Sequence, residues 1–453
     1  MMSSDPPELL VGIDVGTTMT KAAVVGMDGE EISWGKAPTP WQSVPTGAEV
    51  DPAELFDAAM RAMNAALDGA PEGRVVGVGV TSMAETGVLL GPDGSPTSPS
   101  IAWHDTRGAK EAEELADELG RDAFVERTGL PVSSMPTINK LAWLHRHGAP
   151  PLCRALNVAD WVLHRLGAEQ VAEASLASRT GAFSLAERSW WVEALQLVGA
   201  PPGLFPPVVG AGELVGRAEG HVPQRLRGAA LACAGHDHLC VAAGSGVTRP
   251  GQLLDDCGTA EAVVRAAEPV RGPVLRRLVE VGLSAGWHTA PGRYALLGGQ
   301  PLGLVLDRVL ALLGVDGGEP LVTLDRQAWG VSAGSLRLVQ EPLYSDPSIV
   351  GIGLEASPAA LWNAALDAVT EGVHRLVRDM DAIVGPTEEV VLTGGWARCA
   401  GLRRRRKQTF RKVKWPALAE AGARGAALFG GVAAGFFDGP EAFPQPDDQT
   451  EED

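Results

Sequence analysis

The sequence lacks three features that would place it in a specialised class: a cysteine framework, a long apolar run and an excess of positive charge. Its five cysteines form no C-x-x-C pair and show no zinc-ligand spacing, so we expect reduced, buried thiols in a cytosolic protein. No stretch approaches the roughly 18 apolar residues that span a bilayer. Residues 1–10 lack the basic and apolar regions of a signal peptide. We therefore expect a cytoplasmic protein with no membrane partner.

The charge balance also argues against nucleic acid as a partner. The chain has 56 acidic and 38 basic side chains, which give a formal net charge of −18. A basic run at residues 402–415 is the exception, and we interpret it as a solvated helix face and strand. The apolar content of 45% is typical of a globular protein, and 453 residues suffice for two or three domains.

The clearest local pattern is the stretch "LLVGIDVGTTMTKAAVV", in which Asp14 ends an apolar run just before Gly16, Thr17 and Thr18. Residues 20–25 read as a returning strand and residues 31–36 as a third strand, which distinguishes the turn from a P-loop that leads into a helix. An amphipathic helix over residues 51–68, with Asp51 as its N-cap, and a buried strand over residues 74–83 follow.

The same pattern recurs in "GQLLDDCGTAEAVVRAA", where Asp256-Cys257-Gly258-Thr259 again lies between apolar segments. The repeat predicts two similar α/β halves, an N-terminal domain at residues 1–247 and a C-terminal domain at residues 248–436. The Pro-rich, acidic stretch at residues 437–453 is expected to be disordered.

Two such hairpin tips suit a nucleotide held in a cleft between the halves, because Gly-rich turns and hydroxyls donate to phosphate oxygens. Asp14 would repel a phosphate unless a cation lay between them, and Mg²⁺ is held by one or two carboxylates together with phosphates. Lys21 would add a positive charge at the transferred phosphoryl group. Each D-x-G-T motif taken alone remains open to interpretation as an ordinary hairpin.

These motifs resemble those of the FGGY family of carbohydrate kinases. "GIDVGTT" and "CGTAEAV" are similar to the family's two phosphate motifs, "WHDTR" to its W-x-D-x-R segment, "AGHDHL" to the stretch with the catalytic aspartate, and "LTGGWAR" to the adenosine-binding end. The resemblance runs from about Leu10 to about Ala434. It implies the two-domain actin/Hsp70/sugar-kinase fold, which is α/β and ribonuclease H-like, with an interdomain cleft.

The resemblance also implies roles for individual residues. It makes Asp237 the general base that takes the proton of an acceptor hydroxyl as that hydroxyl attacks the γ-phosphoryl group. The implied acceptor pocket comprises Met83, Glu85, Trp103, Asp105 and His238. The implied ATP site comprises Gly16, Thr17, Thr18, Lys21, Gly258, Thr259, Gly394, Gly395 and Trp396, with Asp14 as the Mg²⁺ ligand.

Structural interpretations of these residues remain open. Asp237 would serve as a helix N-cap, Trp103 as core packing, and Glu85 as a solvated strand end. Asp105 and Arg107 would form an ion pair within a loop. Lys140 resembles a family lysine, yet a position on a helix surface fits it equally well.

Departures from the family pattern bear on the substrate. Ala84 stands where glycerol kinases have an arginine, and Met135 stands near the position of their substrate-binding tyrosine. Xylulokinases have Gln-Met-His where this chain has Ser82-Met83-Ala84, so neither glycerol nor xylulose is expected. The segment between Tyr294 and Val390 is shorter than is usual in the family.

We therefore expect an ATP- and Mg²⁺-dependent kinase for a hydroxyl of a monosaccharide, polyol or sugar acid. One alternative keeps the chemistry but takes an unusual sugar of a specialised pathway. The other is a non-catalytic or ATPase-driven interaction protein on the same fold. The expected partner is a small sugar or polyol, and a homodimer is expected by analogy with the family alone.

Overall fold

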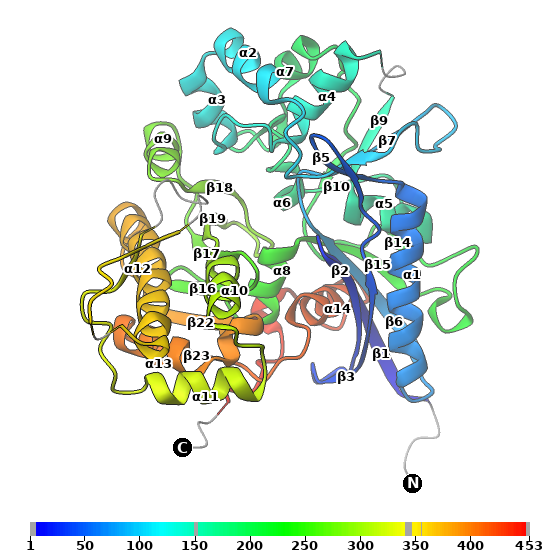
Figure 1. Cartoon of the computed structure of the whole chain (residues 1–453). Coiled ribbons are helices and arrows are strands. Elements are labelled where there is room, and N and C mark those ends of the chain that lie inside the picture. The colour runs from blue at the N-terminus through cyan, green and yellow to red at the C-terminus, as the bar shows by residue number, and fades with distance from the viewer. Residues whose placement is uncertain (1–5, 149–152, 340–346, 355, 450–453) are drawn as a thin grey trace.

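The computed structural model describes residues 6–148, 153–339, 347–354 and 356–449. Two six-stranded sheets form its two halves (Figure 1). The first sheet has the order β14-β15-β6-β1-β2-β3 and the second the order β18-β19-β17-β16-β22-β23. The strands of the first sheet are β1 (Glu8–Val15), β2 (Met19–Val25), β3 (Glu31–Pro38), β6 (Arg74–Ser82), β14 (Gly216–Arg217) and β15 (Ala230–His236). Those of the second are β16 (Gln252–Cys257), β17 (Glu261–Ala267), β18 (Ser284–Trp287), β19 (Tyr294–Gln300), β22 (Glu389–Thr393) and β23 (Val413–Lys414).

The two sheets share one topology. In each, a first strand pairs antiparallel with a second and the second with a third, as β1-β2-β3 and β16-β17-β19. On its other side the first strand pairs in parallel with a fourth and the fourth with a fifth, as β1-β6-β15 and β16-β22-β23. The repeat inferred from the two D-x-G-T motifs is therefore present in the backbone, and the predicted fold is confirmed.

The first sheet is covered on both faces, which explains why β1 and β6 are almost continuously apolar. Helix α1 (Pro52–Gly69) covers one face and begins as predicted, with the Asp51 side chain accepting a bond from the backbone N–H of Ala53. Helix α14 (Ala421–Ala433) packs on the other face (Figure 1). Gly12 and Gly79 allow this close contact, because a Cβ on either residue would overlap backbone atoms of α14.

Other helices surround the two sheets. The upper lobe in Figure 1 contains α2 (Ala109–Leu119), α3 (Arg121–Thr128), α4 (Thr137–Arg146) and α7 (Val192–Leu197), with α5 (Val158–Leu166) and α6 (Ala174–Ala177) below them. Helix α8 (Asp237–Gly244) follows β15 and packs mainly on α14, with further contacts to β16 and β17 of the second sheet. The second half adds α9 (Pro273–Glu280), α10 (Leu302–Leu313), α11 (Glu319–Ala328), α12 (Pro358–Val384) and α13 (Ala400–Thr409). One small sheet has three strands, β4 (Gln42–Val44), β5 (Gly47–Val50) and β8 (Ser100–Ile101). The others are two-stranded and pair β7 (Gly87–Leu90) with β9 (Arg154–Asn157), β10 (Ala172–Glu173) with β13 (Val208–Val209), and β11 (Phe183–Ser184) with β12 (Ser189–Trp190). In the second half β20 (Arg337–Val339) pairs with β21 (Ser348–Val350). Among the described residues, no helix is both long enough and apolar enough to cross a membrane.

Two features of the C-terminal region differ from the sequence-based expectation. The sequence places residues 248–436 in the C-terminal domain, whereas α14 packs on the sheet of the N-terminal half. The tail from residue 437 was expected to be disordered, yet residues 437–449 have defined positions. Phe443 is buried against Phe429 and Phe437, and the guanidinium of Arg424 donates to the carbonyl of Pro444. The segment is acidic and Pro-rich as a whole, but its aromatic side chains bury enough apolar surface to order it.

Candidate active site

Two cavities meet at the start of helix α8, and Asp237 and His238 line both of them. The inner cavity, of about 340 Å³, lies against the ends of β6 and β15. Its wall includes Thr17, Met83, Glu85, Trp103, Met135, Arg179, His236, Ala260, Val279, Leu283, Ser284 and Leu297. The outer cavity, of about 380 Å³, is lined by Asp14, Lys21, Asp256, Thr393, Gly394, Gly395, Arg398, Trp415, Glu420, Gly422 and Gln449, among others.

The two hairpin tips lie at the same cavity. Thr17 comes from the tip between β1 and β2, Ala260 comes from the tip between β16 and β17, and both line the inner cavity. The first tip is held from behind, because the Thr39 hydroxyl donates to the Gly16 carbonyl at 2.8 Å and the indole of Trp41 donates to the Thr17 carbonyl at 2.6 Å. The D-x-G-T repeat therefore brings opposite halves of the chain to one crevice.

Asp237 lies where β15 ends and α8 begins. Its Oδ1 accepts the backbone N–H of His238 at 2.7 Å and lies 3.2 Å from Nε2 of His236. Burial raises the pKa of Asp237, whereas burial lowers the pKa of His236 well below its ordinary value. A carboxylate with a raised pKa, next to a neutral imidazole, is suited to accept a proton from a weakly acidic hydroxyl.

His238 carries positive charge at this junction. The pKa of His238 is raised to about 9, because the attraction of Asp237 and Asp256 outweighs the effect of burial. Its Nδ1 lies 3.3 Å from Oδ2 of Asp256. Asp256 also accepts the Thr393 hydroxyl at 3.0 Å, so the second D-x-G-T motif places its acid beside the first residue of the sequence Thr393-Gly394-Gly395.

Glu85 occupies a strained position in the inner cavity. It has a φ of 59°, which is unusual for a residue other than glycine and is often found at functional sites. Its carboxylate accepts Nε of Arg179 at 2.7 Å, and Nη1 of Arg179 donates to the Ser284 hydroxyl at 2.9 Å. Because Ser284 belongs to β18, this chain of contacts joins the two halves across the cavity.

Trp103 lines the inner cavity and donates its indole N–H to the Thr17 hydroxyl at 2.9 Å. Lys140 is not on a helix surface but buried, and its ammonium donates to the carbonyl oxygens of Trp103, Ser134 and Met135. Desolvation lowers the pKa of Lys140 to about 8. This lysine therefore ties together the two segments that contribute Trp103 and Met135 to the cavity wall.

Asp14 lies in an acidic part of the outer cavity. Burial and the nearby Asp237 raise its pKa to about 7. Its buried Oδ1 has no hydrogen-bond partner among the described residues. Lys21, directly opposite Asp14 in the β1–β2 ladder, forms an ion pair with Glu420 at 2.7 Å. A buried, unpartnered carboxylate oxygen among further acids is what a divalent cation would satisfy.

Several residues predicted for the site do not line either cavity. Asp105 is fully buried and does not line the inner cavity, because its carboxylate forms an ion pair with Arg107 at 2.9 Å. Trp396 packs toward Trp362, with 6.1 Å between their ring centroids, and does not line the outer cavity. Neither cavity is lined by Gly16, Thr18, Gly258 or Thr259, which lie at the two tips beside the lining residues Thr17 and Ala260.

Other lining residues were missed. The aromatic side chain in the outer cavity is Trp415, whose indole donates to Gln449 at 2.7 Å. Arg179 and Glu420 also have no sign of their role in the local sequence, because only the tertiary fold brings them to the cavities. Asp256 had a signal, since it occupies the same place in its motif as Asp14 does in the first.

One cluster of potential metal ligands among the described residues already has a cation. Asp255, Cys257 and Glu261 surround the guanidinium of Arg406, which is 2.7 Å from Asp255 and 2.5 Å from Glu261. All four residues are buried. Arg406 belongs to the basic run that is expected to be solvated, so this expectation does not hold for Arg406. The cluster fixes the second hairpin on both sides of its tip.

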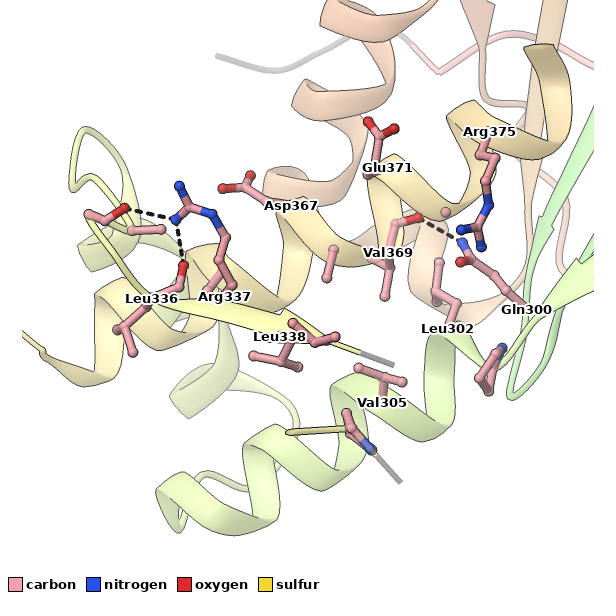
Figure 2. A pocket seen from close by; sticks show the side chains of 18 of the residues that line it. Gln300, Leu302, Val305, Leu336, Arg337, Leu338, Asp367, Val369, Glu371 and Arg375 are labelled. Carbon is pink, nitrogen blue, oxygen red and sulfur yellow. Dashed lines mark hydrogen bonds between the residues drawn. The ribbon is translucent and has the colours of Figure 1, made fainter. Parts of the chain in front are cut away.

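A third cavity, of about 630 Å³, lies outside this site, between α10, β20 and α12 (Figure 2). Figure 2 shows Gln300 at one end, donating to the carbonyl of Val369 at 2.7 Å. Gln300 also donates to Glu261, which lines the inner cavity. Its side chain therefore separates the third cavity from the inner one.

Comparisons with known proteins find carbohydrate kinases of similar sequence and fold. A model of the N-terminal domain of the FGGY family of carbohydrate kinases matches residues 9–244. A xylulose kinase of Streptomyces coelicolor is 32% identical over 97% of this chain and 90% of that protein. A gluconokinase of Bacillus subtilis is 24% identical over 96% of this chain and 89% of that protein. The crystal structure of a xylulose kinase from Rhodospirillum rubrum aligns with a TM-score of 0.85 and 26% identity, over 98% of this chain and 94% of that one.

Proposed function

The chain belongs to the FGGY family of carbohydrate kinases, and we propose that it transfers the γ-phosphoryl group of ATP to a hydroxyl of a monosaccharide, polyol or sugar acid, with Asp237 as the general base. The observation that carries this proposal is the position of Asp237 in the wall shared by the two cavities. A phosphoryl transfer needs a base on the acceptor side and charge stabilisation on the nucleotide side, at one junction.

On this proposal the inner cavity holds the acceptor. Met83 and Trp103 would contact its carbon skeleton, while Glu85 and His238 would bind its hydroxyl groups. Asp237 would take the proton of the attacking hydroxyl, and the raised pKa of Asp237 makes the carboxylate a stronger base than a solvated one. Enclosure of the cavity by residues from both halves would limit the access of water, and so the wasteful hydrolysis of ATP.

The outer cavity would hold the nucleotide. Gly394 and Gly395 line this cavity and allow close approach of a ligand to the backbone. The two hairpin tips, with Thr17 in the wall of the inner cavity and Thr259 beside the lining residue Ala260, would present N–H and hydroxyl groups to phosphate oxygens that reach the junction of the cavities. Lys21, Arg398 and the cationic His238 would offset the negative charge of the phosphates. Trp415, rather than the predicted Trp396, offers an aromatic surface in this cavity.

The acidic part of the outer cavity fits Mg²⁺. Asp14 would hold the ion directly or through water, since its Oδ1 is buried without a partner. Asp256 and Glu420 lie in the same cavity and would hold bound water molecules. The ion, when bound, would neutralise phosphate charge that Asp14 would otherwise repel.

Acceptor-dependent ADP release tests the proposal against the ATPase-driven interaction protein. Purified protein is given Mg²⁺ and ATP, with and without a panel of pentuloses, hexuloses, polyols and aldonic acids. A kinase releases ADP several-fold faster with at least one acceptor and yields one phosphorylated acceptor for each ADP. An interaction protein shows the same rate with every acceptor and no phosphorylated product.

A further inference from the structure

We infer that the acceptor of this kinase carries an apolar end, such as a methyl group in place of a terminal hydroxymethyl group, and that this end lies against one wall of the inner cavity. The inference rests on the proposed function and narrows it from carbohydrates in general to deoxy sugars or polyols. It follows from the uneven distribution of polar groups around the cavity.

One part of the wall is made of apolar side chains from both halves of the chain. Pro131 and Met135 come from the segment between α3 and α4, while Val279, Leu283 and Leu297 come from α9, the segment before β18, and β19. Hydrogen bonding between the Ala285 N–H and the Gly129 carbonyl, at 2.9 Å, joins these two regions. The apolar wall is thus a continuous part of the interface that encloses the acceptor.

Polar side chains near this wall already have partners within the protein. Arg179 donates to both Glu85 and Ser284, and the Ser284 hydroxyl lies 3.4 Å from the carbonyl of Leu297. Glu261 is paired with Arg406 at 2.5 Å. The Thr17 hydroxyl accepts the indole of Trp103 at 2.9 Å. Each of these side chains has at least one partner within the protein, so an apolar end of the acceptor leaves none of them without a hydrogen bond.

The polar groups best placed to bind acceptor hydroxyls lie together at the other side. They are the carboxylate of Asp237, the ring of His238 and Oε2 of Glu85, whose Oε1 accepts Arg179; they come from the segment after β6 and the start of α8. A hydroxyl held there is next to the base, so the opposite end of the acceptor extends toward the apolar wall. A hydroxyl buried at that wall would lose its water without gaining a partner, whereas a methyl group would gain from burial.

Matched pairs of acceptors test this inference. ADP release is measured with D-xylulose against 1-deoxy-D-xylulose, and with ketohexoses against their 6-deoxy counterparts. We expect kcat/KM to be at least about tenfold higher for the deoxy member of the preferred pair. This factor is at the lower end of the discrimination that an apolar pocket achieves for a difference of one methyl-sized group. Equal or better use of the hydroxylated members would overturn the inference and leave the kinase proposal standing. Phosphorylation of no acceptor at all would overturn both.

A pair of variants adds a test that depends on this wall. Val279→Thr has nearly the same shape but adds a hydroxyl at the wall, and we expect it to shift the kcat/KM ratio toward the hydroxylated acceptor by about tenfold. Val274→Thr is the matched control, because Val274 lies on the same helix but is exposed and does not line the cavity. The same ratio in Val279→Thr as in the wild type would contradict the position assigned to the apolar end.

Discussion

Replacement of Arg406 by methionine should destabilise the protein strongly, because Arg406 is the cation of a fully buried cluster. Its guanidinium lies 2.7 Å from the carboxylate of Asp255 and 2.5 Å from that of Glu261, and all three side chains have no exposed surface. Methionine would fill much of the space but leave two buried carboxylates without a counter-charge. Loss of one partner of a buried ion pair costs about 3–5 kcal/mol.

This loss is large compared with the stability of a typical protein, about 5–15 kcal/mol. At about 2–4 °C per kcal/mol for domains of this size, the melting temperature should fall by about 6–20 °C. Arg406→Lys should lie in between, because an ammonium keeps the charge but cannot donate to both carboxylates as a planar fork. The measurement is thermal unfolding followed by circular dichroism or calorimetry.

The matched control is Arg411→Met, in the same basic run but on the surface, which should change the free energy of unfolding by less than about 0.5 kcal/mol.

The effect of Arg406→Met should also depend on pH. Burial and Asp255 raise the pKa of Glu261, so its ionised form costs stability at high pH and that cost disappears as pH falls. Arg406→Met should therefore lose less stability, relative to the wild type, at pH 5 than at pH 8. A melting temperature unchanged from the wild type would refute this account of the cluster.

Three further predictions concern the site. Above a pH of about 8 the ammonium of Lys140 loses a proton, and with it one of its three hydrogen-bond donors, so the KM for the acceptor should rise. Lys140→Met should have a high KM that no longer changes with pH. Steady-state kinetics from pH 6 to 9.5 measure this, and a parallel rise of KM in both proteins would contradict the prediction. Asp14→Asn should raise the melting temperature, because it removes a buried charge repelled by Asp237. The same variant should weaken Mg²⁺-dependent turnover at least about a hundredfold. Loss of both stability and activity would contradict the role assigned to Asp14. Gly394→Ala should weaken ATP binding, which calorimetry measures. Gly394 has a φ of 86°, and a Cβ there would lie 2.6 Å from the Cys257 carbonyl. An unchanged affinity for ATP would show that Gly394 does not belong to the nucleotide site.

Much of the fold could be predicted because its signals are local. Asp14 before Gly-Thr-Thr, with a strand on either side, defines the first hairpin, and the same order around Asp256 defines the second. Asp51 followed by Pro52 marks the start of α1. The order of such motifs along the chain sufficed for the family and for the two-sheet architecture, which the comparisons confirm.

The features that differ from the sequence-based expectation depend on contacts between distant segments. The motif at residues 393–396 does not reveal that Trp396 turns toward Trp362, while Trp415 lines the cavity instead. Asp105 carries the charge expected of a pocket residue, but Arg107, two positions along, occupies its carboxylate. The fold of the tail depends on Phe443 meeting Phe429, a pairing that composition alone does not encode.

The most direct test of the proposed chemistry is the rate of Asp237→Asn in single-turnover phosphorylation of the best acceptor, measured under saturating Mg²⁺ and ATP. Asparagine keeps the size of the side chain but cannot accept the proton, so the rate should fall by about 10²–10⁴-fold while nucleotide affinity changes little. An Asp57→Asn control on the exposed face of α1 should retain the wild-type rate. Retention of the wild-type rate by Asp237→Asn would show that another group takes the proton and that the site has been assigned wrongly.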